Sequence, residues 1–174
     1  MNYTIMPASL DDQPVIYRLF EEAITFQKAN NYIGWSSYDK VFIKADIEKK
    51  QLFKIVLEDE IVCIYSIYKS DVLIWREKEI GDSIYIHRIV LNRKFSGRKL
   101  FANIVNWAIE FAKRNKLKYI RMDTWAENKK IIAYYESYGF SLIEFYRTPA
   151  TENLPVQHRN LLVALLEKKL FNLV

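Results

Sequence analysis

Five basic side chains crowd together near the middle of the sequence, and one short segment among them has the form of an anion-binding loop. The five are Arg88, Arg93, Lys94, Arg98 and Lys99. Ser96-Gly97-Arg98-Lys99 stands at the start of a predicted helix, whose first backbone N–H groups and positive dipole end attract anions. Phosphate loops usually carry two or three glycines, and this one carries only Gly97. The segment alone therefore fits a solvated basic cap as well as a phosphate site.

A second segment, Ala126–Phe140 (AENKKIIAYYESYGF), combines a helix cap with a phenol that can give up a proton. Asn128 is predicted to cap a short helix, and Gly139 is predicted to end it. Tyr134 and Tyr135 are adjacent on this helix, so their side chains point to different sides. A tyrosine beside a thiolate leaving group can act as a general acid. An amphipathic helix with one tyrosine in the core is the alternative, and this segment alone leaves it open.

The bulk properties of the chain restrict the class of protein. It has 174 residues, of which 51% are hydrophobic, and a formal net charge of +5. This length and composition predict one globular domain, residues 1–174, with a sizeable core. Cys63 is the only cysteine and lies in an apolar run, which excludes an internal disulfide and a thiolate metal cluster and predicts a buried side chain. We expect no metal ion, no membrane span and no signal peptide, and therefore a cytoplasmic protein.

The elements that position these residues follow from the periodicity of the apolar side chains. Helices are predicted at residues 15–27, 38–50, 97–114 and 128–138, and strands at 3–6, 83–91, 118–125, 140–147 and 161–168. Residues 53–70 are predicted to form a hairpin around Glu58-Asp59-Glu60, and residues 70–82 a polar connection. The order β-α-α-β-β-β-α-β-α-β-β places antiparallel strands before and after one parallel βαβ crossover. The predicted fold is α/β, with a mixed, mostly antiparallel sheet flanked by helices.

Taken together, the two segments resemble the GCN5-related N-acetyltransferase (GNAT) superfamily. The likeness covers most of the chain and is firmest from Tyr85 to Phe140. The family's V-x-P-x-x-R-G-x-G-x-G/A motif corresponds to Leu91–Phe101, with Gly97 at a core glycine. Its N-x-x-A-x-x-x-Y-E-x-x-G-F motif has isoleucine for alanine here and otherwise matches at Asn128, Tyr135, Glu136, Gly139 and Phe140. The resemblance implies the acyl-CoA N-acyltransferase fold of the family, with acetyl-CoA as co-substrate and no metal.

Three residues depart from the loop motif of the family. Ser96 stands where the family often has arginine or glutamine, and Lys99 and Phe101 stand at positions usually given to glycine, or to glycine or alanine. A cradle of backbone amides tolerates these side chains if Lys99 and Phe101 have ordinary helical angles and point away from the pyrophosphate. Side chains that cannot point away would impair cofactor binding. The alternative to an enzyme is a non-catalytic acyl-CoA-binding module with a regulatory or partner-binding role.

The resemblance implies a role for each matching position. At the end of the predicted 83–91 strand, backbone groups pair with the pantetheine arm of acetyl-CoA; these belong to Ile89, Val90 and Leu91. Backbone amides of the loop hold the pyrophosphate; these belong to Ser96, Gly97, Arg98, Lys99, Leu100 and Phe101. Asn128 contacts the pantetheine region. Tyr135 faces the sulfur and protonates the departing thiolate.

The implied reaction is direct transfer of an acetyl group to a primary amine of a small molecule, an amino acid or a peptide. An amine is protonated at neutral pH, so a base or a water chain must remove a proton. His87 occupies the position where the family often has a carboxylate, and Asp123 on the neighbouring strand can orient its imidazole. A polar pair that only locks two strands fits these residues equally well. Arg88 and Arg121 form a second candidate cross-strand set, and His158 is expected on a surface loop.

The partners are constrained less closely than the co-substrate. Acceptor specificity is expected from three variable segments, 27–38, 70–82 and 148–159, whose aromatic side chains either line a pocket or patch the core. The basic cluster is short and lacks interleaved exposed aromatics, so we expect no nucleic-acid partner. A monomer and a homodimer both remain open, because the last strand, 161–168, can pair within one chain or exchange between two.

Overall fold

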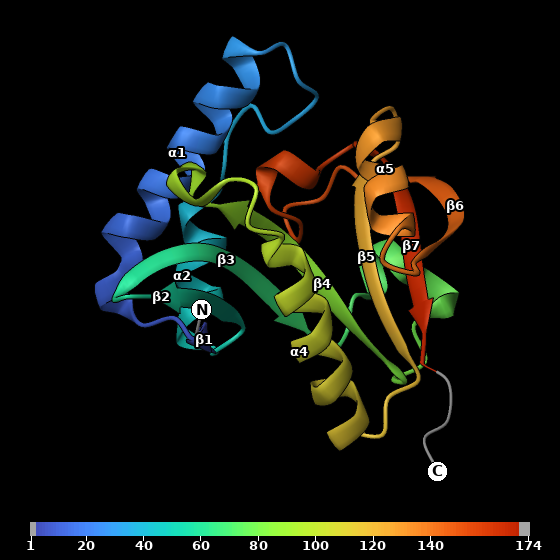
Figure 1. The fold of residues 1–174 in the computed structure, drawn as a ribbon. Coiled ribbons are helices and arrows are strands. Elements are labelled where there is room, and N and C mark those ends of the chain that lie inside the picture. Colours follow the sequence, from blue (N-terminus) through green and yellow to red (C-terminus); the bar gives the residue numbers. More distant parts are fainter. Residues whose placement is uncertain (1–2, 171–174) are drawn as a thin grey trace. The chain divides into compact units, whose positions relative to one another are not determined.

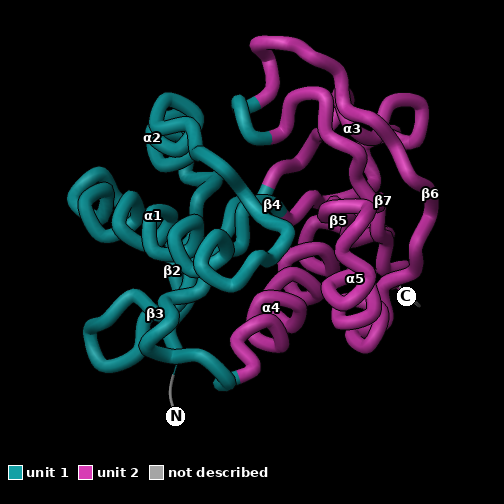
Figure 2. The backbone as a smooth tube through the Cα atoms, turned by 90° about the horizontal axis from the view of Figure 1, so that it is seen from above, with its two compact units in different colours: residues 1–67, 87–98, 155–157 teal, residues 68–86, 99–154, 158–174 magenta. Residues whose placement is uncertain are grey.

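The computed structural model describes residues 3–170, which divide into two compact units (Figure 2). Unit 1 comprises residues 87–98, 155–157 and the described residues up to 67. Unit 2 comprises 68–86, 99–154 and the described residues from 158 onward. Seven strands follow the sheet order β1-β2-β3-β4-β5-β7-β6. The division falls inside β4, after Ile86, so each unit contains its own part of that strand.

The elements follow the predicted order, with short additions (Figure 1). The strands are β1 Thr4–Pro7, β2 Leu52–Leu57, β3 Glu60–Tyr68, β4 Ser83–Leu91, β5 Tyr119–Trp125, β6 Ser141–Arg147 and β7 Leu162–Lys169. The α-helices are α1 Gln13–Ala29, α2 Lys40–Glu48, α3 Val72–Trp75, α4 Leu100–Arg114 and α5 Lys129–Glu136. Short 3-10 helices are η1 Leu10–Asp12, η2 Arg76–Lys78, η3 Arg93–Phe95 and η4 Val156–His158. The predicted α/β fold with a mixed sheet is therefore confirmed.

Unit 1 is built on the antiparallel pairs β1–β2 and β2–β3. The predicted hairpin is confirmed, and its turn residues Glu58 and Asp59 both have positive φ, 49° and 64°, as a type I′ turn requires. Asp39 caps α2, because its side chain accepts hydrogen bonds from the first amides of that helix. Cys63 is buried, as predicted. The core of the unit contains Ile16, Leu19, Phe20, Ile43, Ile47, Leu52, Ile64 and Val90.

Unit 2 contains the predicted parallel crossover. The first four residues of β4 pair with β5 in parallel register, from Ser83 opposite Tyr119 to Ile86 opposite Met122. Helix α4 makes the connection and contacts β5. Strand β7 pairs antiparallel with both β5 and β6, so the last strand finds its partners within the chain. A separate core cluster contains Ile74, Trp75, Tyr85, Leu154, Val163 and Leu165.

Three local details differ from the prediction. Residues 70–82, expected as a polar connection, contain α3 and η2, because Trp75 is fully buried and packs on Tyr85 with ring centroids 5.9 Å apart. Helix α2 begins only after its cap, at Lys40. Helix α4 begins at Leu100 and not at Gly97, because a residue with positive φ cannot continue a right-handed helix. Within residues 3–170, no helix is long and apolar enough to cross a membrane.

Candidate functional site

The loop between β4 and α4 starts with a turn that Asn92 caps. The Asn92 side chain accepts a hydrogen bond from the amide of Lys94 at 3.1 Å. The amide of Ser96 donates to the carbonyl of Arg93 and closes η3, so this amide of the predicted cradle is used within the turn. Residues 96–99 are all exposed. The amides that follow lead into α4, whose first N–H groups have no acceptor within the helix and suit an anion.

Two residues of this loop have a left-handed backbone. Gly97 has φ 82°, and a Cβ placed there would meet no atom within 4 Å. The glycine is therefore required by the backbone conformation and not by lack of space. Lys99, the N-cap of α4, has φ 51° and ψ 37°. The condition of ordinary helical angles is therefore not met at Lys99, which carries a side chain in a left-handed conformation that glycine adopts at little steric cost.

Phe101 lies in the first turn of α4 and points into an aromatic cluster formed by the end of α5 and the residues that follow it. It is only 6% exposed. Its ring centroid is 4.9 Å from that of Tyr135 and 4.9 Å from that of Tyr138, and Tyr134 and Phe140 complete the cluster. The large side chain at a position usually given to a small residue is thus explained by packing within unit 2. Phe101 has the helical conformation that the sequence-based expectation required.

Helix α5 presents Asn128 and Tyr135 as predicted from its sequence. The Asn128 side chain caps the helix by accepting a hydrogen bond from the amide of Ile131 at 3.2 Å. Tyr135 is half-buried beside Phe101. Gly139 ends the helix with φ 83°, and a Cβ there would lie 2.5 Å from Nζ of Lys168. That lysine donates to the carbonyl of Tyr138 at 2.9 Å. Its flexible end can shift, so the positive φ is what favours glycine here.

The second half of β4 belongs to unit 1 and contains a residue whose conformation sequence reasoning missed. Arg88 has φ 52° in the interior of the strand. Its buried guanidinium forms an ion pair with Asp46 of α2, and Ser66 of β3 donates to the same Asp46 oxygen at 2.7 Å. Asp46 carries no motif that marks it, because its partner lies on a distant strand. The predicted pantetheine-binding residues Ile89, Val90 and Leu91 follow Arg88 directly.

The predicted general base and its orienting carboxylate fall in different units. His87 is 5% exposed and belongs to unit 1, whereas Asp123 of β5 is half-buried and belongs to unit 2. The parallel pairing of β4 with β5 ends at Ile86 opposite Met122, one residue before His87 and Asp123. The role of His87 and Asp123 therefore stays a prediction. In unit 2, a carboxylate oxygen of Asp71 lies within 4.8 Å of one of Asp123; Asp71 lies in a variable segment and had no sequence signal.

The second candidate set, Arg88 with Arg121, is not a cross-strand pair. The register places Arg121 opposite Tyr85. The guanidinium of Arg121 donates to Glu167 at 2.8 Å and to the Tyr85 hydroxyl at 3.1 Å, and it lies 4.6 Å from the ring centroid of Trp75. Burial, together with a hydrogen bond to Glu79, raises the pKa of the Tyr85 phenol. Arg121 therefore satisfies buried groups of unit 2, as Arg88 does in unit 1.

Two further expectations concern residues outside the loop. His158, expected on a surface loop, is buried in η4, where its carbonyl accepts a hydrogen bond from the Thr148 hydroxyl at 2.5 Å. The aromatic side chains of residues 27–38 divide between core and surface. Trp35 and Tyr38 pack on Phe20, with centroids 5.4 Å and 5.1 Å away. Tyr32 is 59% exposed and therefore does not patch the core.

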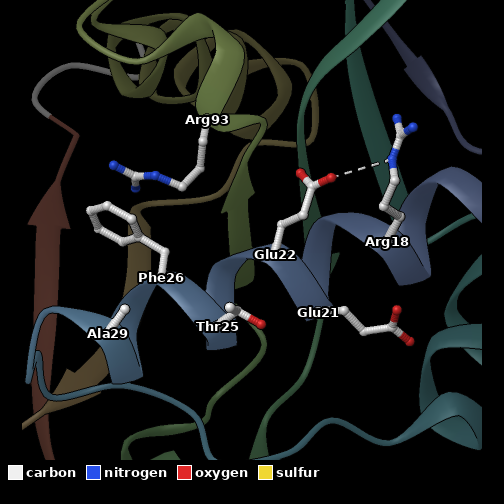
Figure 3. A pocket seen from close by; sticks show the side chains of 7 residues that line it. All are labelled: Arg18, Glu21, Glu22, Thr25, Phe26, Ala29 and Arg93. Carbon is white, nitrogen blue, oxygen red and sulfur yellow. Dashed lines mark ion pairs between the residues drawn. The ribbon is translucent and has the colours of Figure 1, made fainter.

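A depression of about 590 Å³ lies in unit 1 along α1 (Figure 3). Its lining consists of Arg18, Glu21, Glu22, Thr25, Phe26, Ala29 and Arg93. The guanidinium of Arg93 lies over the ring of Phe26, 3.2 Å from its centroid, and Glu22 forms an ion pair with Arg18 at 3.6 Å. Glu21 accepts a hydrogen bond from the hydroxyl of Tyr38 at 2.6 Å. The charged groups of the depression are therefore already paired with one another or with neighbouring side chains.

Comparison with known proteins gives a consistent result. The family model described as "Acetyltransferase (GNAT) family" matches residues 17–140. A curated Bacillus subtilis (strain 168) protein, "Uncharacterized N-acetyltransferase YesJ", is 26% identical over 148 residues, which are 79% of this chain and 81% of that protein.

Solved structures extend the likeness to nearly the whole chain. An acetyltransferase of the GNAT family from Listeria monocytogenes 4b F2365 superposes with a TM-score of 0.79 at 21% identity, covering 97% of this chain and 95% of that one. The structure of yncA from Salmonella typhimurium, determined with its cofactor acetyl-CoA, has a TM-score of 0.66 at 15% identity and covers 99% and 96% of the two chains. At these identities the superpositions establish the fold.

Proposed function

The chain belongs to the acetyltransferase (GNAT) family, and from this premise we propose that it transfers an acetyl group from acetyl-CoA to a primary amine of a small molecule, an amino acid or a peptide. The observation that carries the proposal lies within unit 2. The ring of Tyr135 packs on Phe101, in the first turn of α4. A half-buried phenol therefore lies next to a helix start whose amides suit a phosphate group.

Binding of the co-substrate is proposed to use the backbone. Ile89, Val90 and Leu91 would hold the pantetheine arm, and the amides from Gly97 to Phe101 would hold the pyrophosphate. The amide of Ser96 donates to the carbonyl of Arg93, so this amide is left out of the proposed cradle. Two observations support this proposal: residues 96–99 are exposed, and Phe101 is buried in the aromatic cluster of unit 2.

The chain's own groups would move two protons during transfer. The neutral amine nitrogen forms a bond to the carbonyl carbon as the bond between that carbon and sulfur breaks. Tyr135 would give its hydroxyl proton to the departing sulfur, which otherwise leaves as a thiolate. His87, oriented by Asp123, would accept the proton that the amine must lose, either directly or through water. Asn128 would contact the pantetheine region beside Tyr135.

Binding and turnover should be measured separately to test this function. Calorimetric titration with acetyl-CoA is expected to show one site per chain, with a short oligonucleotide at moderate salt as the negative control. Release of free thiol in the presence of a panel of small amines, amino acids and peptides is then expected for at least one class of acceptor. Binding without thiol release for any amine would favour the non-catalytic acyl-CoA-binding module, and absence of binding would exclude both.

A further inference from the structure

Arg88 is a long, charged residue in a backbone conformation that such residues rarely adopt. Its φ of 52° lies in the left-handed region, although it stands in the interior of β4. A non-glycine residue persists in this conformation only where its surroundings hold it there. A single left-handed residue also bends a strand and changes the direction of the groups that follow it. The question is therefore what holds Arg88 and which groups it re-aims.

The side chain of Arg88 is held by a buried network across three elements of unit 1. Its side chain is 2% exposed, and that of its ion-pair partner Asp46 on α2 is 4% exposed. The same Asp46 oxygen accepts the hydroxyl of Ser66 on β3 at 2.7 Å. The helix around Asp46 is itself fixed, because the Asp46 carbonyl accepts the amide of Gln51 at 2.8 Å. Buried charges are retained where their geometry is satisfied, and such pairs often specify one conformation.

The groups that Arg88 re-aims are those next along β4. Val90 is buried in the core of unit 1, and the amide of Asn92 donates to the carbonyl of Val62 at 2.9 Å. The strand is thus tied to its own unit at Arg88, Val90 and Asn92. Ile89 and Leu91, the residues between these ties, are only half-buried. Their backbone orientation is determined by the left-handed residue before them and the anchored residues beside them.

We propose that Arg88 is a positioning residue. Its buried ion pair with Asp46 holds the backbone of β4 in the conformation in which Ile89 and Leu91 bind acetyl-CoA. The inference rests on the proposed function, since it concerns the same co-substrate. It adds that α2, which contributes no group to the reaction, sets the affinity for acetyl-CoA through Asp46. Arg88 touches neither co-substrate nor acceptor in this account.

The test removes the ion pair without leaving a buried charge. The double variant Arg88→Gly/Asp46→Asn keeps a residue that tolerates positive φ and keeps an acceptor for Ser66. Calorimetry is expected to show a Kd for acetyl-CoA raised by about tenfold or more, as small displacements of positioning groups do. The KM for acetyl-CoA should rise in the same proportion, with a smaller change in kcat. Arg88→Lys, which retains the positive charge, is expected to fall between wild type and the double variant.

A matched control separates positioning from loss of stability. Lys54→Met/Asp12→Asn removes another ion pair of unit 1, between β2 and η1, where Nζ of Lys54 lies 2.8 Å from Asp12. This control should lower Tm and leave the Kd for acetyl-CoA unchanged. If Arg88→Gly/Asp46→Asn does not fold, the Kd of Arg88→Lys decides: a raised value supports the inference, and a wild-type value overturns it.

Failure of the inference is distinguishable from failure of the proposed function. If wild type binds acetyl-CoA and the folded double variant binds it with the same Kd and KM, Arg88 has only a structural role. If wild type does not bind acetyl-CoA, the proposed function fails, and the inference fails with it.

Discussion

Tyr135 is the side chain on which the proposed chemistry depends most directly, because a phenol next to the thioester can protonate the leaving sulfur. We expect Tyr135→Phe to retain the wild-type Kd for acetyl-CoA, since the ring and its contact with Phe101 remain. Loss of the proton donor should lower kcat by about a hundredfold or more. Tyr134→Phe on the same helix is the matched control, because Tyr134 is 40% exposed. Unchanged kcat in Tyr135→Phe across the pH range would remove the acid role.

The left-handed backbone of Lys99 lowers the stability of the fold, and a substitution by glycine should remove this strain. Its φ of 51° is disfavoured for any residue with a Cβ. Lys99→Gly should raise the free energy of unfolding by about 1 kcal/mol relative to Lys99→Ala, which keeps the Cβ but loses the charge. Urea unfolding monitored by tryptophan fluorescence measures the difference. Equal stability of the two variants would show that the left-handed conformation of Lys99 is not retained in solution.

At the scale of elements, Phe101 joins the start of α4 to α5. Four aromatic rings of the segment 134–140 surround its side chain, and two of them have centroids 4.9 Å from its own. The contact places the predicted acid beside the predicted phosphate-binding amides. The family usually has a small residue at this position, whereas here an aromatic cluster within unit 2 joins the first turn of α4 to the segment 134–140.

Replacement of Phe101 tests this junction. Phe101→Ala should lower the free energy of unfolding by about 3–5 kcal/mol, because a buried ring is lost and a cavity remains. Phe111→Ala on the same helix is the control, since Phe111 is half-buried and stacks on Trp107 with ring centroids 5.1 Å apart. Urea unfolding of both variants measures the loss. A smaller loss in Phe101→Ala than in Phe111→Ala would contradict the packing account.

For the molecule as a whole, ionisation of the Cys63 thiol is expected to depend on whether the chain is folded. The thiol is buried, and that burial raises its pKa to about 12. A thiol whose pKa is raised on folding stabilises the fold fully below its unfolded pKa of 9.0 and loses that contribution as pH rises through about 12. Stability should therefore fall between these pH values more steeply in wild type than in Cys63→Ala.

The same burial should make the Cys63 thiol unreactive in the folded protein. A disulfide reagent that detects free thiols should react with Cys63 only when the chain is unfolded, because the reactive species is the exposed thiolate. The measurement is the colour yield with and without denaturant. Immediate reaction of the native protein would contradict the burial. A silent cysteine also means that thiol released during turnover comes from the co-substrate.

The sheet order has its own consequence for assembly. Strand β6 stands at one end of that order, and its pairing with β7 shifts register between Leu142 and Glu144. An irregularity of this kind at an edge discourages pairing with another strand. Glu144 also forms ion pairs with Arg76 and Lys78. The choice between monomer and homodimer stays a prediction to be tested by the mass in solution.

Much of the fold was predictable because it depends on residues close together in sequence. The apolar face of α4, the β-rich runs around Glu58-Asp59 and the cap at Asn128 each act over a few positions. Short elements were missed for the opposite reason. α3 has four residues and no periodicity of its own; it exists because Trp75 packs on Tyr85.

The sequence by itself determined the βαβ crossover, the family motifs and the candidate residues Gly97, Asn128 and Tyr135, since motif spacing and local conformation require no distant partner. The tertiary structure alone decided where Phe101 points, the left-handed conformation of Lys99 and the partner of Arg88. Asp46 and Arg88 are 42 positions apart. Many acids of the sequence were equally eligible for that arginine, and only the folded chain places one of them within reach of it.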